Sequence, residues 1–324
     1  MTSTTKAEHS RPKSWTWSPA VDHGLAGIGA GFVSTFTLHP LDFIKTRLQV
    51  DDTARGKQKP LIGRSITVVR SAWINEGGLR SLYRGLTPNL AGNVTSWGLY
   101  LFWYNGIKQR MAEYNLDNSN SDQLSSVQFL SAAALGGALT QLCANPLWVV
   151  KTRMCTTSSG QQGSYRGLWD GLSTIARTEG IRGLYRGLVP GLMGCTHGAF
   201  QFMAYEEMRR WRSNQLKRRY SSSSSSSSDA KLSAFDITIM SSTSKVFAAL
   251  VTYPVQVIRA RLQNPKTAVK YSGFFDAVRK MAMSEGPLGF YKGLGPNIAR
   301  MLPGSIITFN VMEFLSALMA RHAT

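Results

Sequence analysis

The sequence PLDFIKTR at residues 40–47 returns as PLWVVKTR at residues 146–153 and again as PVQVIRAR at residues 254–261. The three copies start 106 and 108 residues apart. A second motif follows each copy. It consists of an EG dipeptide, at residues 76–77, 179–180 and 285–286, and an aromatic-basic-glycine triplet, at residues 83–85, 185–187 and 291–293. Two motifs in the same register over three periods indicate three copies of one structural unit.

A proline followed by an acidic and then two basic residues, repeated three times, resembles the signature of the mitochondrial carrier family. The resemblance covers about residues 21–320. It implies an all-α membrane protein, in which six tilted transmembrane helices form three pseudo-symmetric repeats around a central cavity, with three short matrix helices. It also implies a transporter that moves a small molecule and is not an enzyme.

Each repeat is expected to hold a long helix, a short amphipathic helix and a second long helix. The long helices are predicted at residues 21–49, 86–112, 124–154, 187–212, 231–263 and 294–320, and the short ones at 62–76, 167–179 and 273–285. The predicted organisation is a polar N-terminal tail (1–20), carrier repeats at 21–115, 124–213 and 230–321, and a disordered basic and poly-serine loop (214–229), because a serine run cannot bury apolar surface.

The composition is consistent with helices that have one face lining a water-filled cavity. The formal charge is +19, from 37 basic and 18 acidic residues, and the mean hydropathy is −0.13. No run of 18 residues is purely apolar, as expected for helices that line a polar cavity. The basic residues flank the predicted helices, which favours contact with anionic lipid over nucleic acid.

The three cysteines are scattered, so neither a disulfide framework nor a metal site is predicted. No cofactor is expected. The resemblance implies a monomer in the mitochondrial inner membrane, with cardiolipin as a lipid partner and both termini facing the intermembrane space. A peroxisomal membrane stays open as an alternative.

Other classes of protein are less well supported. The chain holds no glycine-rich dinucleotide loop after a strand, no P-loop and no His/Cys metal spacing, and its five histidines do not cluster. A basic nucleic-acid-binding protein and a receptor or uncoupling-type relative of the carriers remain as rivals.

In the family, rings of salt bridges close each end of the cavity. Carried onto this chain, the resemblance pairs Asp42 with Lys151 at the matrix end. The other two pairs lack an acid: Trp148 would face Arg259 in a cation–π contact, and Gln256 would face Lys45 in a hydrogen bond. Inward kinks of the odd helices are expected to close this end, at Pro40, Pro146 and Pro254.

The cytoplasmic gate follows an aromatic-acidic-x-x-basic pattern on the even helices. The expected pairs are Lys108 with Glu206, Arg209 with Glu313, and Asn105 with Ser316. The loss of the acid and the loss of the base fall on the same pair, so no charge is left unmatched. Two ionic pairs at this end against one at the matrix end predict that the two closed states differ in stability.

The substrate-binding prediction rests on polar residues that share helix faces. Charged residues within a membrane span are functional candidates, and Arg binds phosphate or carboxylate in bidentate fashion. These groups favour an anionic, planar solute. The candidates are Arg300, Lys245, Asn93, Ser96, Tyr100, Met193, Gly194, His197, Gln201 and Gln141.

A finer resemblance narrows the solute. Trp148, where most carriers have an acid, resembles the subgroup for folate, flavin, pyrimidine nucleotides and NAD. Runs at residues 96–102, 198–207 and 244–248 look most like the folate/FAD carriers. The serine insertion hints at a fungal or protist source, which favours the flavin. The prediction is an FAD carrier, with folate or tetrahydrofolate as the alternative, then pyrimidine nucleotides or NAD.

Overall fold

The computed structural model describes residues 19–52, 61–119, 124–158, 164–221 and 234–322, and these form helices and turns without a strand. The fold is therefore all-α, as expected. The predicted N-terminal tail lies outside the described residues except for its last two positions. The same holds for residues 222–229 of the predicted serine-rich loop.

Five of the predicted long helices are continuous. They are α1 (Pro19–Val50), α4 (Leu86–Ser119), α5 (Ser126–Thr156), α9 (Ala234–Gln263) and α12 (Leu294–His322).

The fourth predicted helix differs from the expectation. It is divided into α7 (Leu188–Met193), the 3₁₀ turn η1 (Gly194–Thr196) and α8 (His197–Ser221). Residues 214–221, assigned to the loop from sequence, belong to α8. The stretch Gln215–Arg219 consists of good helix formers, which explains why the helix continues to the serine run.

The predicted short helices are α2 (Leu61–Asn75), α6 (Leu168–Leu184) and α11 (Phe274–Glu285). Three further turns of helix are α3 (Leu79–Leu82), α10 (Pro265–Ala268) and the 3₁₀ turn η2 (Pro287–Tyr291). Gly180 interrupts α6 with φ of 68°, a left-handed conformation that glycine adopts without steric cost. The regular part of α6 therefore ends at Glu179, where the sequence placed it.

The chain divides into two compact units. One contains Met1–Leu38 and Leu302–Thr324, and the other contains His39–Met301. Within the first unit, α1 and α12 approach closely: a Cβ on Gly29 would lie 2.7 Å from Leu315 Cδ1. Ser34 Oγ also lies 3.4 Å from the carbonyl oxygen of Gly304.

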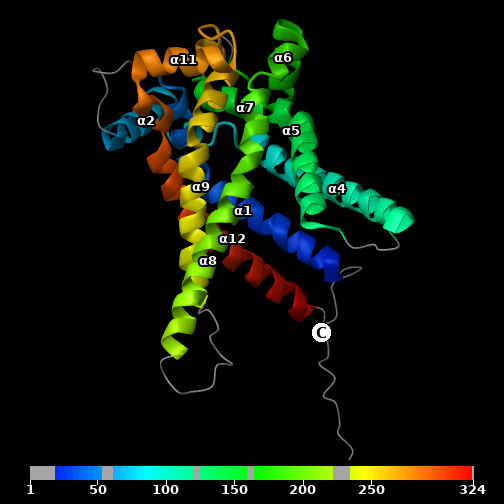
Figure 1. Cartoon of the computed structure of the whole chain (residues 1–324). Coiled ribbons are helices and arrows are strands. Elements are labelled where there is room, and N and C mark those ends of the chain that lie inside the picture. The colour runs from blue at the N-terminus through cyan, green and yellow to red at the C-terminus, as the bar shows by residue number, and fades with distance from the viewer. Residues whose placement is uncertain (1–18, 53–60, 120–123, 159–163, 222–233, 323–324) are drawn as a thin grey trace, which may run out of the picture. The chain divides into compact units, whose positions relative to one another are not determined.

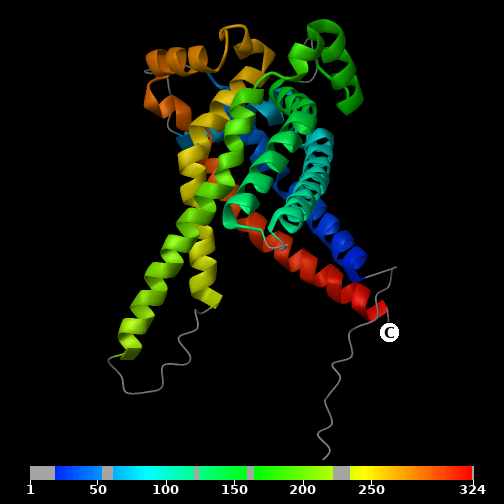
Figure 2. The same cartoon turned by 45° about the vertical axis from the view of Figure 1, so that its right-hand side comes forward.

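In the larger unit α4 runs alongside α5, and α8 runs alongside α9 (Figures 1 and 2). Backbones approach where side chains are small: a Cβ on Gly136 of α5 would lie 3.3 Å from the backbone nitrogen of Tyr104. An amide pair, Asn115 and Gln128, joins α4 to α5 at 2.8 and 3.0 Å. Each packed pair therefore links an even helix of one repeat to the odd helix of the next.

Each signature helix packs on the short helix of its own repeat through a small apolar cluster. Phe43 and Leu48 of α1 contact Ala72 of α2. Val150 of α5 contacts Ile175 of α6. The largest cluster joins α9 to α11 and contains Tyr253, Val257, Ile258, Leu262, Ala277 and Met281.

An ion pair strengthens each of these contacts, and the pair of the third repeat is fully buried. The last arginine of every signature pairs with the glutamate of the EG motif: Arg47 with Glu76 at 2.6 Å, Arg153 with Glu179, and Arg261 with Glu285 at 2.5 Å. All three pairs are bidentate, the geometry in which guanidinium and carboxylate bind best. The two repeated motifs noticed in the sequence therefore meet in space.

The same three arginines also connect neighbouring repeats, and we call this set the arginine ring. The Nε of Arg47 donates to the carbonyl of Cys155 at 2.9 Å, that of Arg153 to Gln263 at 3.1 Å, and that of Arg261 to Gln49 at 3.0 Å. Each acceptor lies in the last turn of an odd helix, where carbonyls lack helical partners and cations are favourable. Each repeat thus caps the next one around a closed cycle.

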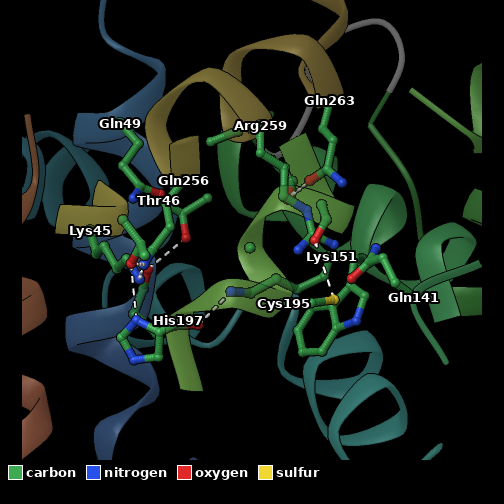
Figure 3. Close-up of a pocket in the computed structure, with 17 residues that line it drawn as sticks. Lys45, Thr46, Gln49, Gln141, Lys151, Cys195, His197, Gln256, Arg259 and Gln263 are labelled. Carbon is green, nitrogen blue, oxygen red and sulfur yellow. Dashed lines mark hydrogen bonds and ion pairs between the residues drawn. The ribbon is translucent and has the colours of Figure 1, made fainter. Parts of the chain in front are cut away.

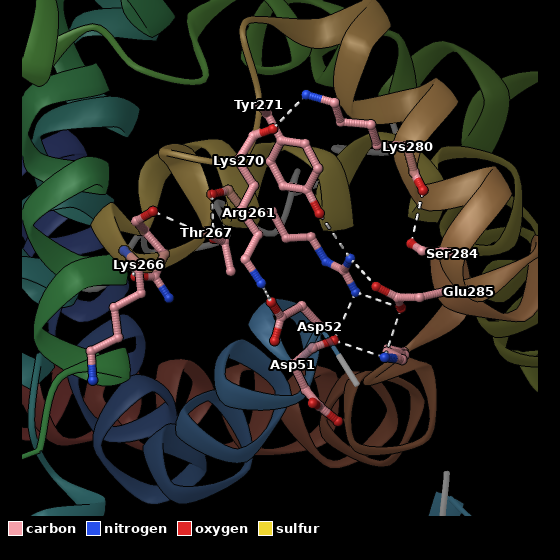
Figure 4. A network of polar contacts seen from close by, with 12 residues as sticks. Asp51, Asp52, Arg261, Lys266, Thr267, Lys270, Tyr271, Lys280, Ser284 and Glu285 are labelled. Carbon is pink, nitrogen blue, oxygen red and sulfur yellow. Dashed lines mark hydrogen bonds and ion pairs between the residues drawn. The ribbon is translucent and has the colours of Figure 1, made fainter. Parts of the chain in front are cut away.

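The junction between the third and first repeats holds further contacts, shown in Figure 4. Arg261 Nη2 and Lys292 Nζ both donate to the carbonyl of Asp51, at 2.7 and 2.8 Å. Lys292 also pairs with Glu285 at 2.7 Å, and Lys270 pairs with Asp52. Lys270 thus adds an ion pair that joins the third repeat to the first at this junction.

Prolines lie inside four of the long helices. Pro40, Pro146 and Pro254 are within α1, α5 and α9, and the kinks expected there stay a prediction. Pro303 within α12 was not singled out from sequence. By length and composition, two described segments are apolar enough to cross a membrane, Val127–Thr156 and Pro287–Leu318.

Candidate functional site

A cavity of about 380 Å³ lies in the larger unit, among α1, α5, α7, η1, α8 and α9. Figure 3 shows it from close by. All six residues predicted for the matrix gate line this cavity: Asp42, Lys45, Trp148, Lys151, Gln256 and Arg259. The signature motifs of three repeats, separated by more than 100 residues, therefore contribute to one site.

Two of the three expected contacts between these residues are present. Lys151 Nζ lies 2.5 Å from Asp42 Oδ2, and Lys45 Nζ donates to Gln256 Oε1 at 3.2 Å. The third expected contact is different. The cation over the Trp148 ring is Lys151, 6.0 Å from the ring centroid, and not Arg259. Trp148 and Lys151 are three residues apart on one helix, so they share a face.

Unpaired N–H donors remain at the same cavity. Arg259 Nη2 and Gln263 Nε2 are buried without a hydrogen-bond partner among the described residues. Gln263 Oε1 already accepts from Thr152 Oγ1 at 2.8 Å, which leaves its amide nitrogen as the open group. A solute that brings acceptor oxygens would satisfy these buried donors.

A chain of polar contacts crosses the other side of the cavity. From Lys45 it passes through Gln256 to Thr252, whose Oγ1 lies 3.5 Å from Gln256 Nε2. It ends at His197, whose Nδ1 lies 2.9 Å from Thr252 Oγ1. In Figure 3 the labelled Lys45, Gln256 and His197 lie at the left, and Lys151 and Gln263 at the right.

The charge of the lining is strongly positive. Lys45, Lys151 and Arg259 face one carboxylate, Asp42. That carboxylate is already paired with Lys151, and Arg300 Nε lies 3.8 Å from its second oxygen. The cavity therefore favours an anionic solute over a cationic one.

The structure places the predicted substrate-binding residues in different surroundings. Gln141, Gly194 and His197 line the cavity. Arg300 is not part of the lining, but it contacts Asp42, which is.

The other candidates lie outside this cavity. Asn93, Ser96 and Tyr100 are on α4, where Ser96 Oγ is buried without a partner and Tyr100 stacks on Tyr104. Helix α4 reaches the site at Gly92, whose Cβ would lie 3.4 Å from the Trp148 ring. Met193, Gln201 and Lys245 also lie outside the lining, at the end of α7 and on α8 and α9.

Sequence reasoning missed about half of the lining. Helical spacing could have identified some of these residues, because Gln49 and Gln263 follow Lys45 and Arg259 by four residues, about one helical turn. Thr252 precedes Gln256 by the same interval. The missed residues are Thr46, Gln49, Thr152, Gly191, Cys195, Thr252, Ala260 and Gln263.

The predicted gate pair of Lys108 and Glu206, both in the larger unit, is not formed in the described residues. Lys108 Nζ lies 5.6 Å from the Phe129 ring centroid, and Glu206 pairs with Arg209 of the same helix at 3.5 Å. Across the described chain, no ion pair joins Lys108 to Glu206. Asn105 lies on α4, whereas Glu313 and Ser316 belong to the smaller unit. All three pairs of this gate stay predictions.

The family model described as mitochondrial carrier protein matches residues 16–115, 122–216 and 230–323. Folate transporter 1 (chloroplastic) of Arabidopsis thaliana is 42% identical over 315 residues, with 96% of this chain and 98% of the relative covered. The mitochondrial FAD carrier protein of Saccharomyces cerevisiae is 33% identical over 314 residues, with 92% and 97% covered.

A third relative is nicotinamide adenine dinucleotide transporter 1 (chloroplastic) of Arabidopsis thaliana. It is 36% identical over 304 residues, with 93% of this chain and 92% of the relative covered. These relatives are named as transporters of different cofactors, and all span nearly the whole chain. The three matched segments correspond to the three repeats of the signature, so the chain belongs to the mitochondrial carrier family and is a transporter of a small-molecule cofactor, not an enzyme.

Proposed function

We propose that this carrier moves an anionic cofactor with a fused heteroaromatic ring across the mitochondrial inner membrane, with FAD as the first candidate and folate as the second. The observation that carries the proposal is the cavity lining, in which three cations face a single carboxylate that is already paired. The unpaired donors of Arg259 and Gln263 add hydrogen-bonding capacity for phosphate or carboxylate oxygens.

The shape of the solute follows from the other lining groups. Trp148 presents an indole ring at the cavity, and aromatic faces stack on flat heterocycles. A small dicarboxylate would leave this ring and the glutamines of the lining without a role. A large solute that joins an anionic part to a flat ring uses both kinds of group.

FAD and folate both meet this description. FAD carries a pyrophosphate and an isoalloxazine ring, whereas folate carries two carboxylates and a pterin ring. The sequence runs described above favour FAD and folate alike, and the preference for FAD rests on the serine insertion, which hints at a fungal or protist source. The folate alternative is supported by the higher identity to a relative named as a folate transporter, 42% against 33% for one named as an FAD carrier.

In this proposal transport proceeds by alternating access. The six residues at the cavity close the matrix gate, and the residues on the even helices close the cytoplasmic gate in the opposite state. Monomeric function, bound cardiolipin and termini in the intermembrane space complete the proposal.

The test is uptake by purified protein in liposomes that are preloaded in turn with FAD, FMN, folate, tetrahydrofolate, NAD and UTP. Preferential FAD flux supports the first candidate. Flux of folates alone reassigns the solute and retains the cavity. Absence of flux with every one of these compounds refutes the proposed function.

A further inference from the structure

His197 has two ring nitrogens in different surroundings. It begins α8, directly after η1, and contributes to the cavity lining. Its Nδ1 lies 2.9 Å from Thr252 Oγ1.

The hydrogen bonds of Thr252 decide which nitrogen carries the proton. A hydroxyl has one hydrogen to donate, and Thr252 Oγ1 lies 2.8 Å from the carbonyl of Ala248, which accepts that hydrogen. The hydroxyl oxygen must therefore accept from His197. A neutral imidazole that donates from Nδ1 carries its lone pair on Nε2.

Few other acceptors of this cavity are open. Asp42 is paired with Lys151, Gln256 Oε1 accepts from Lys45, and Gln263 Oε1 accepts from Thr152. The buried lining groups that have no partner among the described residues, on Gln49, Arg259 and Gln263, are donors. Nothing in the described part of the chain donates to His197 Nε2, so this nitrogen is a free acceptor in a lining rich in donors.

We propose that His197 Nε2 is a specificity-determining acceptor, which binds a ring N–H of the carried solute. The chemical class is a cyclic lactam or imide, the N–H–C=O unit present in isoalloxazine, pterin and uracil rings alike. This inference rests on the proposed function for its solute. It orients that solute with the ring at His197, at the lower left of Figure 3, and the anionic part at Arg259 and Gln263, at the upper middle and upper right.

Two variants test the roles of the two ring nitrogens of His197 separately. In His197→Asn the amide occupies the place of Nδ1 and can still donate to Thr252, but nothing replaces Nε2. In His197→Gln the amide oxygen reaches the place of Nε2. We expect KM for the carried cofactor to rise about tenfold in His197→Asn, the effect of one lost hydrogen bond, and to change less than about threefold in His197→Gln.

A chemical control uses the cofactor methylated at the ring N–H, which removes the donor. Wild-type protein should discriminate against the methylated cofactor, and His197→Asn should transport both forms with similar KM. A helix-packing role for His197 would lower transport of both forms equally in either variant, and that result overturns the proposal. Equal KM values for the two forms in wild-type protein overturn it as well.

The inference can fail separately from the proposed function. If wild-type protein carries neither FAD nor folate, the proposed function is wrong, and the same methylated pair is made for whichever cofactor is transported. Independently, ¹⁵N NMR of histidine-labelled protein in lipid nanodiscs, with His197→Gln to assign the signal, reports the tautomer. Protonation at Nδ1 supports the acceptor role of Nε2, and protonation at Nε2 overturns it.

Discussion

At the scale of single residues, the cavity is organised around Asp42. This carboxylate joins Lys151 at 2.5 Å and approaches Arg300 at 3.8 Å. Arg300 is the weaker partner: its side chain is 37% exposed and its Nε has no hydrogen bond among the described residues. An anionic solute can therefore take Arg300 from Asp42 without breaking a good hydrogen bond.

Arg300→Ala should lower the initial rate of cofactor uptake in liposomes by about 10- to 100-fold, because a hydrogen bond to a charged group contributes about 1.5–3 kcal/mol. Arg300→Lys retains the charge without the bidentate geometry, so its uptake rate should lie between those of the wild-type protein and Arg300→Ala. Size-exclusion chromatography and thermal melting check that both variants remain folded. Wild-type uptake by Arg300→Ala would contradict the placement of the substrate site.

Individual residues of the cavity also show which parts of the site could be predicted from the sequence. Because the three copies of the signature align residue by residue, the sequence predicts the six gate positions together, and they share one cavity. The cation at Trp148 is Lys151 and not the predicted Arg259. This contact depends on the directions of two side chains on the same helix, and pairing positions between repeats does not take those directions into account. Thr152 and Thr252 were missed because hydroxyls have no distinctive spacing.

At the scale of elements, the short helices are fixed to the signature helices by an apolar cluster and one bidentate ion pair each. The positions of α2, α6 and α11 followed from the EG motif, and their starts and regular ends agree with the sequence prediction within about one residue. The division of the fourth long helix at η1 was not predicted. Residues 187–212 contain several glycines but no proline after Pro190, so no strong local signal marks the break.

Glu179 makes the attachment of α6 sensitive to pH. The hydrogen bonds from Arg153 hold its pKa below the usual range, although burial opposes this effect. A carboxylate with a depressed folded pKa stabilises the protein fully above its unfolded pKa, about 4.3. That contribution is lost as pH falls through the lower, folded value.

Glu179→Gln should therefore destabilise the protein in detergent by about 2 kcal/mol at pH 7, and the difference from wild type should shrink below about pH 4. Melting followed by intrinsic fluorescence measures both values. Glu113→Gln, at an exposed position of α4, is the matched control and should not change the melting temperature. A pH-independent difference would indicate that the ion pair with Arg153 is not the cause.

At the scale of the whole molecule, alternating access requires the contacts among repeats to form and break in each cycle. The predicted matrix gate has one ionic pair, whereas the predicted cytoplasmic gate would have two. The arginine ring adds contacts to backbone carbonyls that do not depend on an acid in the signature. It provides a reason why a gate with Trp148 and Gln256 in place of acids can still close.

Trp148→Asp with Gln256→Asp should shift the carrier toward the state with the matrix gate closed. The acid at position 256 would face Lys45 of the first repeat, and the acid at position 148 is expected to pair with Arg259. Accessibility of single cysteines placed on either side of the cavity, in a background without native cysteines, reports the shift. The expected result is lower labelling from the matrix side and slower turnover. Unchanged labelling would count against the gate assignment.

The three junctions of the arginine ring should differ in strength. Arg261→Gln removes the bidentate partner of the fully buried Glu285, which keeps Lys292 as its other cation, and it also removes the donors to the carbonyls of Gln49 and Asp51, so we expect a loss of about 3 kcal/mol. Arg47→Gln is the matched variant and should cost less, because the side chains of Arg47 and Glu76 are partly exposed and Arg47 donates to one backbone carbonyl, whereas Arg261 donates to two. Denaturation of the two purified variants under identical conditions makes the comparison. Equal losses would show that the deeper burial and the additional carbonyl contact of Arg261 have no energetic effect.

The junction between the third and first repeats also has a consequence for biogenesis. The contact of Arg261 with the carbonyl of Gln49 spans 212 residues, and that of Lys292 with the carbonyl of Asp51 spans 241. Contacts of such long sequence separation form late, because loop closure must precede them. The first repeat therefore emerges from synthesis and inserts with the carbonyls at the end of its signature helix uncapped, until the last repeat arrives to complete the cycle.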